Sequence, residues 1–197
     1  MPNAEIIYFD SPGKKNTEDV MDAVVKRIDK GDISHVIVAS STGETAKKLI
    51  SCVGGSRAQV VVVTSQCGFD KEGECEMSVE VERSLVSSGA RVVRASHVLS
   101  GVERSISKRL GGASRVEAIS EALRSLFGQG LKVCVEITVM AADNGAIPCG
   151  DNNIIAVGGW ADGADTAIVV RPAHANAFFN FEIREILAWP RRKRVPK

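Results

Sequence analysis

The stretch HVIVASSTGETA, from His35 to Ala46, decides how this sequence folds. Its apolar, largely β-branched run at residues 35–39 is typical of a buried strand. A turn of hydroxyl residues and glycine follows, and a helix is predicted at residues 45–52, ending near Gly54 and Gly55. A strand, a polar turn and a helix in this order begin a βαβ unit. The stretch therefore predicts a parallel sheet flanked by helices.

The same order of strand and helix recurs on both sides of this stretch. Further strands are predicted at residues 5–9, 60–63 and 92–95, and further helices at residues 17–30 and 78–88. Beyond residue 100 the pattern is less regular, and helices are expected at residues 102–110 and 115–127. Residues 132–142 are ambiguous, because alternating Val and Ile fit a strand, whereas Met140-Ala141-Ala142 favour a helix. We interpret this segment as a helix.

The carboxy-terminal part contains apolar runs at residues 154–157 and 166–170, joined by the glycine-rich residues 158–165. This connection is too short for a crossover helix, so it favours antiparallel pairing. A last apolar stretch spans residues 183–189. The sequence thus predicts one α/β domain over residues 1–197, a three-layer sandwich whose mostly parallel sheet carries an antiparallel carboxy-terminal strand pair.

Composition excludes several classes of protein. Hydrophobic residues make up 44% and charged residues 25% of the 197 residues, and the net charge is only +1, so no overall field favours nucleic acid or an anionic membrane. We expect no membrane span and no secretory signal. Five cysteines without a C-x-x-C pair argue against a disulfide framework and against structural zinc, and they favour the cytoplasm. The basic tail at residues 191–194 is interpreted as solvated or facing a partner subunit.

The turn from Ser40 to Thr45 is the main candidate for a binding site. Ligands of parallel sheets bind at the carboxyl ends of the strands, and a helix start there offers free N–H groups and a positive dipole end to an anion such as phosphate. Gly43 would let the backbone approach the ligand closely. The alternative is that Ser41 or Thr42 merely caps a helix, and the pattern alone leaves both open. The turn is neither a P-loop nor G-x-G-x-x-G, so nothing supports nucleotide hydrolysis.

Two separated segments resemble the carboxy-terminal domain of pyruvate kinase. Residues 39–49 are similar to its effector-phosphate loop, and residues 154–166 are similar to the strand, glycine loop and strand that close the same pocket. The whole chain looks like small stand-alone proteins, largely archaeal, that are grouped with that domain and lack the catalytic barrel. Residues 8–18, 96–102 and 133–137 carry this closer resemblance.

The resemblance implies the fold of that domain without kinase activity, and a phosphate pocket whose leading ligand is flavin mononucleotide (FMN). One departure concerns Glu44, which stands where pyruvate kinases commonly carry Arg or Lys. A carboxylate there disfavours a bisphosphate sugar and is more compatible with a monophosphate. We expect the ring system to lie across the Gly159-Trp160 loop. The predicted binding residues are Ser40, Ser41, Thr42, Gly43, Thr45, Gly13, Lys14, Asn16, Thr17, Ser65, His97, Gly159 and Trp160.

His97 is the one candidate for a catalytic residue, although without a visible partner a packed histidine is the simpler interpretation. Nothing in the sequence pairs Glu136 or Asp143 for acid–base work, Cys67 is interpreted as structural, and no metal site is expected. Alternative functions are a flavin-dependent oxidoreductase, a phosphosugar enzyme and a regulatory module that binds an effector. The exposed last strand predicts a homo-oligomer, with a small phosphorylated ligand as the other partner.

Overall fold

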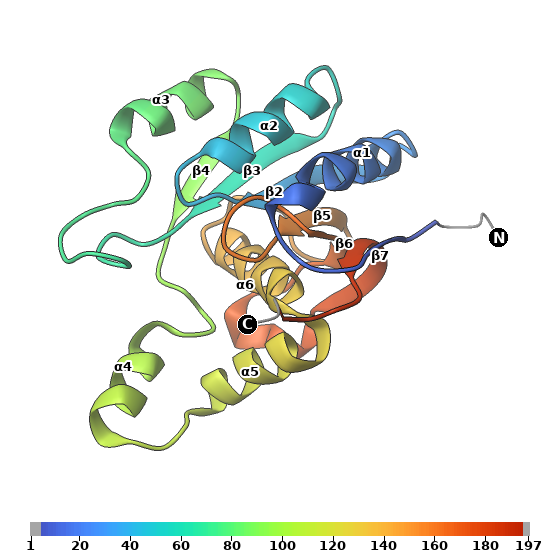
Figure 1. Ribbon diagram of the computed structural model, residues 1–197. Coiled ribbons are helices and arrows are strands. Elements are labelled where there is room, and N and C mark those ends of the chain that lie inside the picture. Colours follow the sequence, from blue (N-terminus) through green and yellow to red (C-terminus); the bar gives the residue numbers. More distant parts are fainter. Residues whose placement is uncertain (1–4, 195–197) are drawn as a thin grey trace.

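One seven-stranded sheet organises residues 5–194, the part of the chain that the computed structural model describes (Figure 1). The strand order is β1-β7-β6-β5-β2-β3-β4, with β6 antiparallel to both of its neighbours and the other adjacent pairs parallel. The strands are β1 (Ile7–Phe9), β2 (Ile33–Ala39), β3 (Gln59–Thr64), β4 (Arg91–Arg94), β5 (Asn153–Gly158), β6 (Thr166–Arg171) and β7 (Glu182–Pro190).

Helices cover both faces of the sheet and complete a three-layer sandwich. In Figure 1, α1, α2 and α3 lie on one face and α6 on the other, with α5 packed on the outer side of α6 and α4 next to α5. The helices are α1 (Thr17–Ile28), α2 (Glu44–Val53), α3 (Val79–Ser87), α4 (Gly101–Leu110), α5 (Arg115–Phe127) and α6 (Gln129–Asp143), and two 3₁₀ segments span Lys14–Asn16 and Ala175–Asn180.

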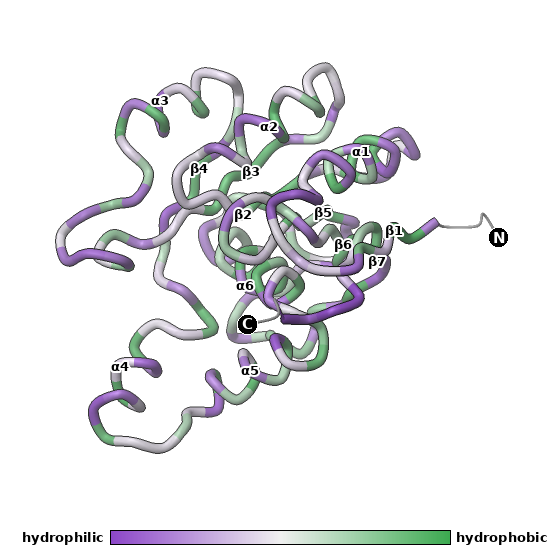
Figure 2. The backbone as a smooth tube through the Cα atoms, in the orientation of Figure 1, coloured by the Kyte–Doolittle hydropathy of each residue, from purple (hydrophilic) through white to green (hydrophobic). Residues whose placement is uncertain are grey.

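Strand β2 shows why the sheet is covered on both faces. Val36 and Val38 pack into the core under α1 and α2, whereas Ile37 between them packs into the second core under α6, and all three are fully buried. Successive side chains of a strand point to opposite faces, so a strand covered on both sides reads as a continuous apolar run. Figure 2 shows the same distribution, with apolar strands inside and a polar loop over residues 66–76.

The predicted fold class is confirmed, including the antiparallel pairing of β5 with β6 and the helix over residues 132–142. Helix α6 is buried on almost every side, because the sheet lies on one side of it and α5 on another. A helix that is apolar all round lacks the usual periodicity, and this explains the ambiguous pattern. None of the helices within residues 5–194 has the length and apolar character needed to cross a bilayer.

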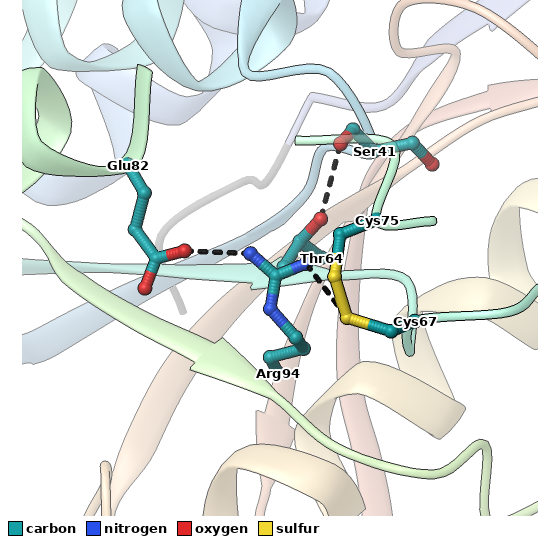
Figure 3. Close-up of a disulfide and its surroundings, with 6 residues drawn as sticks. All are labelled: Ser41, Thr64, Cys67, Cys75, Glu82 and Arg94. Atoms are coloured by element: carbon teal, nitrogen blue, oxygen red, sulfur yellow. Dashed lines mark hydrogen bonds and ion pairs between the residues drawn. A yellow bond between two sulfur atoms is a disulfide. The ribbon is translucent and has the colours of Figure 1, made fainter. Parts of the chain in front are cut away.

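Two expectations need correction. Strand β7 is an edge only in part, because it pairs with β6 on one side and β1 covers residues 188–190 on the other, so the edge argument for a homo-oligomer is limited to residues 182–187. The argument against disulfides is wrong for one pair, since Cys67 and Cys75 are bonded within the loop between β3 and α3 (Figure 3). An odd cysteine count excludes complete pairing only, and the seven residues between Cys67 and Cys75 form a loop that brings the two side chains together.

Candidate functional site

A cavity of about 710 Å³ lies at the carboxyl ends of β2, β3 and β5. Here β2 pairs with β3, the next strand along the chain, on one side and with the distant β5 on the other, so the strand order reverses. This is the place where open α/β sheets bind ligands, and the volume is within the usual range for small molecules of about 300–1,000 Å³. Three walls surround the cavity: the turn after β2, the paired loops before α1 and after β5, and the inner face of α6.

The turn after β2 presents free backbone donors to the cavity. Helix α2 begins at Gly43 without a side-chain cap, and Ser40 Oγ accepts a hydrogen bond only from the Ala46 N–H, at 3.3 Å. Within residues 5–194, no protein group accepts a hydrogen bond from the N–H groups of residues 42–45. The alternative that Ser41 or Thr42 caps this helix is therefore wrong. Instead Ser41 Oγ lies 3.0 Å from Ser65 Oγ, which joins the turns after β2 and β3.

Gly43 has a structural role that was not predicted from the sequence. Its φ of 95° lies in the left-handed region, and a Cβ at this position would collide with Val81 and touch Leu85, both on α3. Gly43 is also not among the residues that line the cavity. The shape of the turn and the close packing of α3 are thus sufficient to require a glycine here.

The second wall is held together by Asp165, which is fully buried between two loops. Its Oδ2 accepts hydrogen bonds from the backbone N–H groups of Gly13 and Trp160, each at 2.9 Å, and its Oδ1 accepts one from the Thr166 hydroxyl at 2.8 Å. Burial raises the pKa of this carboxyl, and the three hydrogen bonds oppose that rise. Thr17 adds a further link, because its Oγ1 accepts from the Ala164 N–H at 3.0 Å. These bonds fix the loop before α1 against the loop after β5.

Nine of the thirteen predicted binding residues line the cavity, namely Ser40, Ser41, Thr42, Thr45, Lys14, Thr17, Ser65, His97 and Gly159. The other four do not. Gly43 contacts α3, Gly13 binds Asp165, and Asn16 is buried with its side-chain amide donating to the Ser11 carbonyl at 2.9 Å. Trp160 lies beside Arg124 and Lys193 in a separate, shallower pocket. The loop after β5 instead reaches the cavity through Gly159 and residues 161–163.

The third wall holds a cluster of three ionisable side chains, which we call the α6 cluster: His97, Lys132 and Glu136. Glu136 Oε2 is 2.5 Å from Lys132 Nζ and 3.4 Å from His97 Nδ1, and Glu136 Oε1 accepts the Leu99 N–H at 3.0 Å. Lys132 and Glu136 are only 3% exposed. Burial alone would raise the pKa of Glu136, but hydrogen bonding from His97 and the charge of Lys132 lower this pKa to about 2. The carboxylate is therefore ionised.

This cluster contradicts the interpretation that His97 and Glu136 have no partners. Asp143, the other carboxylate considered unpaired, binds His174 Nδ1 at 3.1 Å on the surface. The signal for the buried pair was present in the sequence, because Lys132 and Glu136 are the only charged residues from 130 to 142 and are four apart. Such a spacing places both on one face of a helix. The contact with His97 depends on the long-range packing of α6 and has no local signal.

Residues from α4, α5 and the β3–α3 loop complete the lining. Arg104 on α4 lines the cavity together with Arg124, Phe69 and Glu76. Phe69 stacks on the His97 ring with centroids 4.8 Å apart, and the loop that carries Phe69 is closed by the Cys67–Cys75 bond. Arg94 Nη1 is 3.9 Å from Cys67 Sγ, and Arg94 also binds Glu82 at 2.6 Å (Figure 3). A cation therefore lies beside the Cys67–Cys75 bond.

Residues 18–170 match the model of one protein family, described as the pyruvate kinase alpha/beta domain. The matched range includes the turn after β2, the loop after β5 and all three residues of the α6 cluster.

Proposed function

The chain belongs to the family of the pyruvate kinase alpha/beta domain, and we propose that it binds a phosphate-bearing small ligand, with FMN as the leading candidate. The observation that carries this proposal is the set of free N–H groups at residues 42–45, which lie at the start of a ten-residue helix and beside a ligand-sized cavity. Such groups attract a phosphate, because they supply hydrogen-bond donors and about half a positive charge from the helix dipole.

The side chains around the turn support a monophosphate. The Ser41 and Thr42 hydroxyls lie at the cavity, and Lys14 lines it from the loop before α1. Glu44 is mostly exposed and forms an ion pair with Lys47 at 3.2 Å, so its charge is partly compensated at the rim. A second phosphate beside this carboxylate would be repelled, whereas one phosphate on the N–H groups would not compete with it.

The rest of the cavity suits a flat ring system. Val133, Ile137 and Met140 contribute an apolar surface from α6, and the Phe69–His97 stack contributes an aromatic one. Small-molecule sites combine such surfaces with a few polar groups that fix orientation. A flavin ring joined to a phosphate by a flexible chain matches this combination of a polar end and an apolar end.

The experiment compares FMN with riboflavin, which lacks the phosphate, by absorbance and fluorescence titration of purified protein. Thr42→Asp places a carboxylate on an exposed position of the turn, and Ser56→Asp makes the same change beyond the far end of α2. We expect FMN to bind the wild type and Ser56→Asp alike, and Thr42→Asp to bind FMN at least tenfold more weakly, with riboflavin affinity the same in all three. Equal affinity for FMN and riboflavin in the wild type, or no binding of FMN, would refute the proposal.

A further inference from the structure

The α6 cluster needs an explanation beyond stability. Burying two charges carries a desolvation cost that an ion pair often only offsets, and a well-packed apolar pair of similar size is frequently as stable or more stable. Lys132 and Glu136 nevertheless lie in the buried helix α6, and both line the cavity. The Lys132–Glu136 pair, whose burial costs desolvation energy, therefore lies on the α6 wall of the same cavity as the turn after β2, where a ligand would contact it.

The hydrogen bonds of Glu136 determine which nitrogen of His97 carries the proton. An ionised carboxylate only accepts hydrogen bonds, so the Nδ1 that faces Glu136 Oε2 at 3.4 Å is the donor. In the neutral ring Nε2 then has a free lone pair. No atom within residues 5–194 forms a hydrogen bond with Nε2, and this atom has almost no accessible surface, so a ligand reaches it only when a neighbouring side chain shifts. A buried nitrogen without a partner is uncommon and calls for a binding role.

His97 is held in this orientation from two sides. Glu136 fixes the ring through Nδ1, and Phe69 covers one ring face at a centroid distance of 4.8 Å. The ring itself is 19% exposed and lines the cavity. The other charged side chains that line the cavity are Lys14, Glu44, Lys48, Glu76, Arg104, Arg124, Lys132, Glu136 and Asp162. Of these, Lys132 is neutralised by Glu136, and within the α6 cluster the imidazole is the group with a nitrogen that has no hydrogen-bond partner among the described residues.

We propose that His97 Nε2 accepts a proton from an N–H or O–H group of the phosphate-anchored ligand, with Glu136 as the positioning residue. This inference rests on the proposed function, in which the turn after β2 holds the phosphate of the ligand. In the transfer, the N–H or O–H bond of the ligand breaks and leaves its electron pair on the ligand. The proton binds the lone pair of Nε2, and the resulting imidazolium lies next to the Glu136 carboxylate. The ligand class is a phosphomonoester with a weakly acidic ring N–H or hydroxyl, which includes FMN.

The first experiment needs no ligand. Nitrogen NMR of ¹⁵N-histidine-labelled protein reports the tautomer of each of the three histidines. We expect neutral His97 to carry its proton on Nδ1, and the fraction with the proton on Nε2 to increase in Glu136→Gln, a change that a merely structural role of Glu136 would not cause. A proton on Nε2 in the neutral wild type would overturn the proposal. The wild-type spectrum decides this even where Glu136→Gln does not fold.

The second experiment measures FMN affinity between pH 5 and 8 for the wild type, His97→Gln and His174→Gln. His174 is a matched control, because it also contacts a carboxylate through Nδ1 but lies on the surface outside the cavity. Nε2 must be unprotonated to accept from the ligand, so wild-type and His174→Gln affinities should fall by up to about tenfold per pH unit on the acid side, relative to His97→Gln. The phosphate ionises equally in all three.

The two proposals fail in different ways. FMN that binds to none of these proteins refutes the assignment of FMN as ligand, whereas the tautomer of His97 is still measured directly. FMN that binds the wild type and His97→Gln with the same pH dependence overturns the role of His97 and leaves the phosphate site intact.

Discussion

The Lys132–Glu136 pair gives the sharpest prediction about stability. Its two charges are 2.5 Å apart and almost completely buried. Glu136→Gln removes one charge and leaves the Lys132 ammonium in the core, and breaking a buried pair in this way costs about 3–5 kcal/mol. Burial already lowers the pKa of Lys132, so part of this loss is recovered as pH rises and the amine loses its proton. The double variant Lys132→Met/Glu136→Leu removes both charges but leaves the buried Leu99 N–H and His97 Nδ1 without an acceptor, so at pH 7 it should lose about 1–3 kcal/mol, less than Glu136→Gln.

The change in the free energy of unfolding as pH falls gives a second, independent measure of what the Lys132–Glu136 pair contributes. The pKa of Glu136 is lowered from 4.5 in the unfolded chain to about 2 in the fold. A carboxyl with a depressed pKa contributes stability that is present above pH 4.5 and is lost as pH falls toward 2, and this difference corresponds to about 3 kcal/mol. The double variant lacks this contribution. Its free energy of unfolding should therefore decline less than that of the wild type over this range.

Urea denaturation at pH 7, 4.5 and 3, followed by circular dichroism, measures both effects. Glu74→Gln is the matched control, because Lys71 and Glu74 form an exposed ion pair whose loss should cost less than about 1 kcal/mol. The reasoning is refuted if Glu136→Gln is no less stable than Glu74→Gln at pH 7. It is equally refuted if the wild type and the double variant lose the same stability between pH 4.5 and 3.

Two further predictions concern the turn and the loop that border the cavity. Gly43→Ala should destabilise the fold by about 2 kcal/mol or more in urea denaturation, because it adds a collision with Val81 to the strain of a positive φ. The control Gly55→Ala has a φ of 90° and open space around it, so it should show the strain alone. Equal losses in the two variants would show that α3 does not press on the turn. Thiol titration of the unreduced, denatured protein should find three free thiols, those of Cys52, Cys134 and Cys149. After reduction the same titration should find five thiols. Five thiols before reduction would exclude the Cys67–Cys75 bond.

Local patterns were sufficient for the fold because each element carries its own signal. Strand β2 is a run of β-branched residues, Gly31 and Gly89 follow the helices α1 and α3, and Ser114 caps α5 through a box with Glu117. The position of β1 had no such signal. It pairs with β7, nearly 180 residues further along the chain, and only the packing of the whole sheet determines that neighbour.

The same distinction separates the site residues that were predicted from those that were not. The turns after β2 and β3 could be found because the ends of parallel strands meet at one edge, so the sequence order of strand and turn is sufficient. Asp165 and the contact between His97 and Glu136 were missed, because their partners are distant in sequence and are brought together by the loop after β5 and by α6. A buried carboxylate has few ways to be satisfied, so the informative sign was a charge within an apolar segment.

Two buried carboxylates lie at or beside the cavity, and their hydrogen-bond donors give them different roles. Asp165 and Glu136 are both buried acceptors, but their donors differ. Asp165 accepts two backbone N–H groups and a hydroxyl, none of which titrates near neutral pH, so it serves to hold two loops in place. Glu136 accepts one backbone N–H together with the Lys132 ammonium and His97 Nδ1, and both of these side chains line the cavity. Of the two, only Glu136 is therefore joined to a cavity-lining side chain with a nitrogen that lacks a partner within residues 5–194, and this is the contact on which the proposed proton exchange rests.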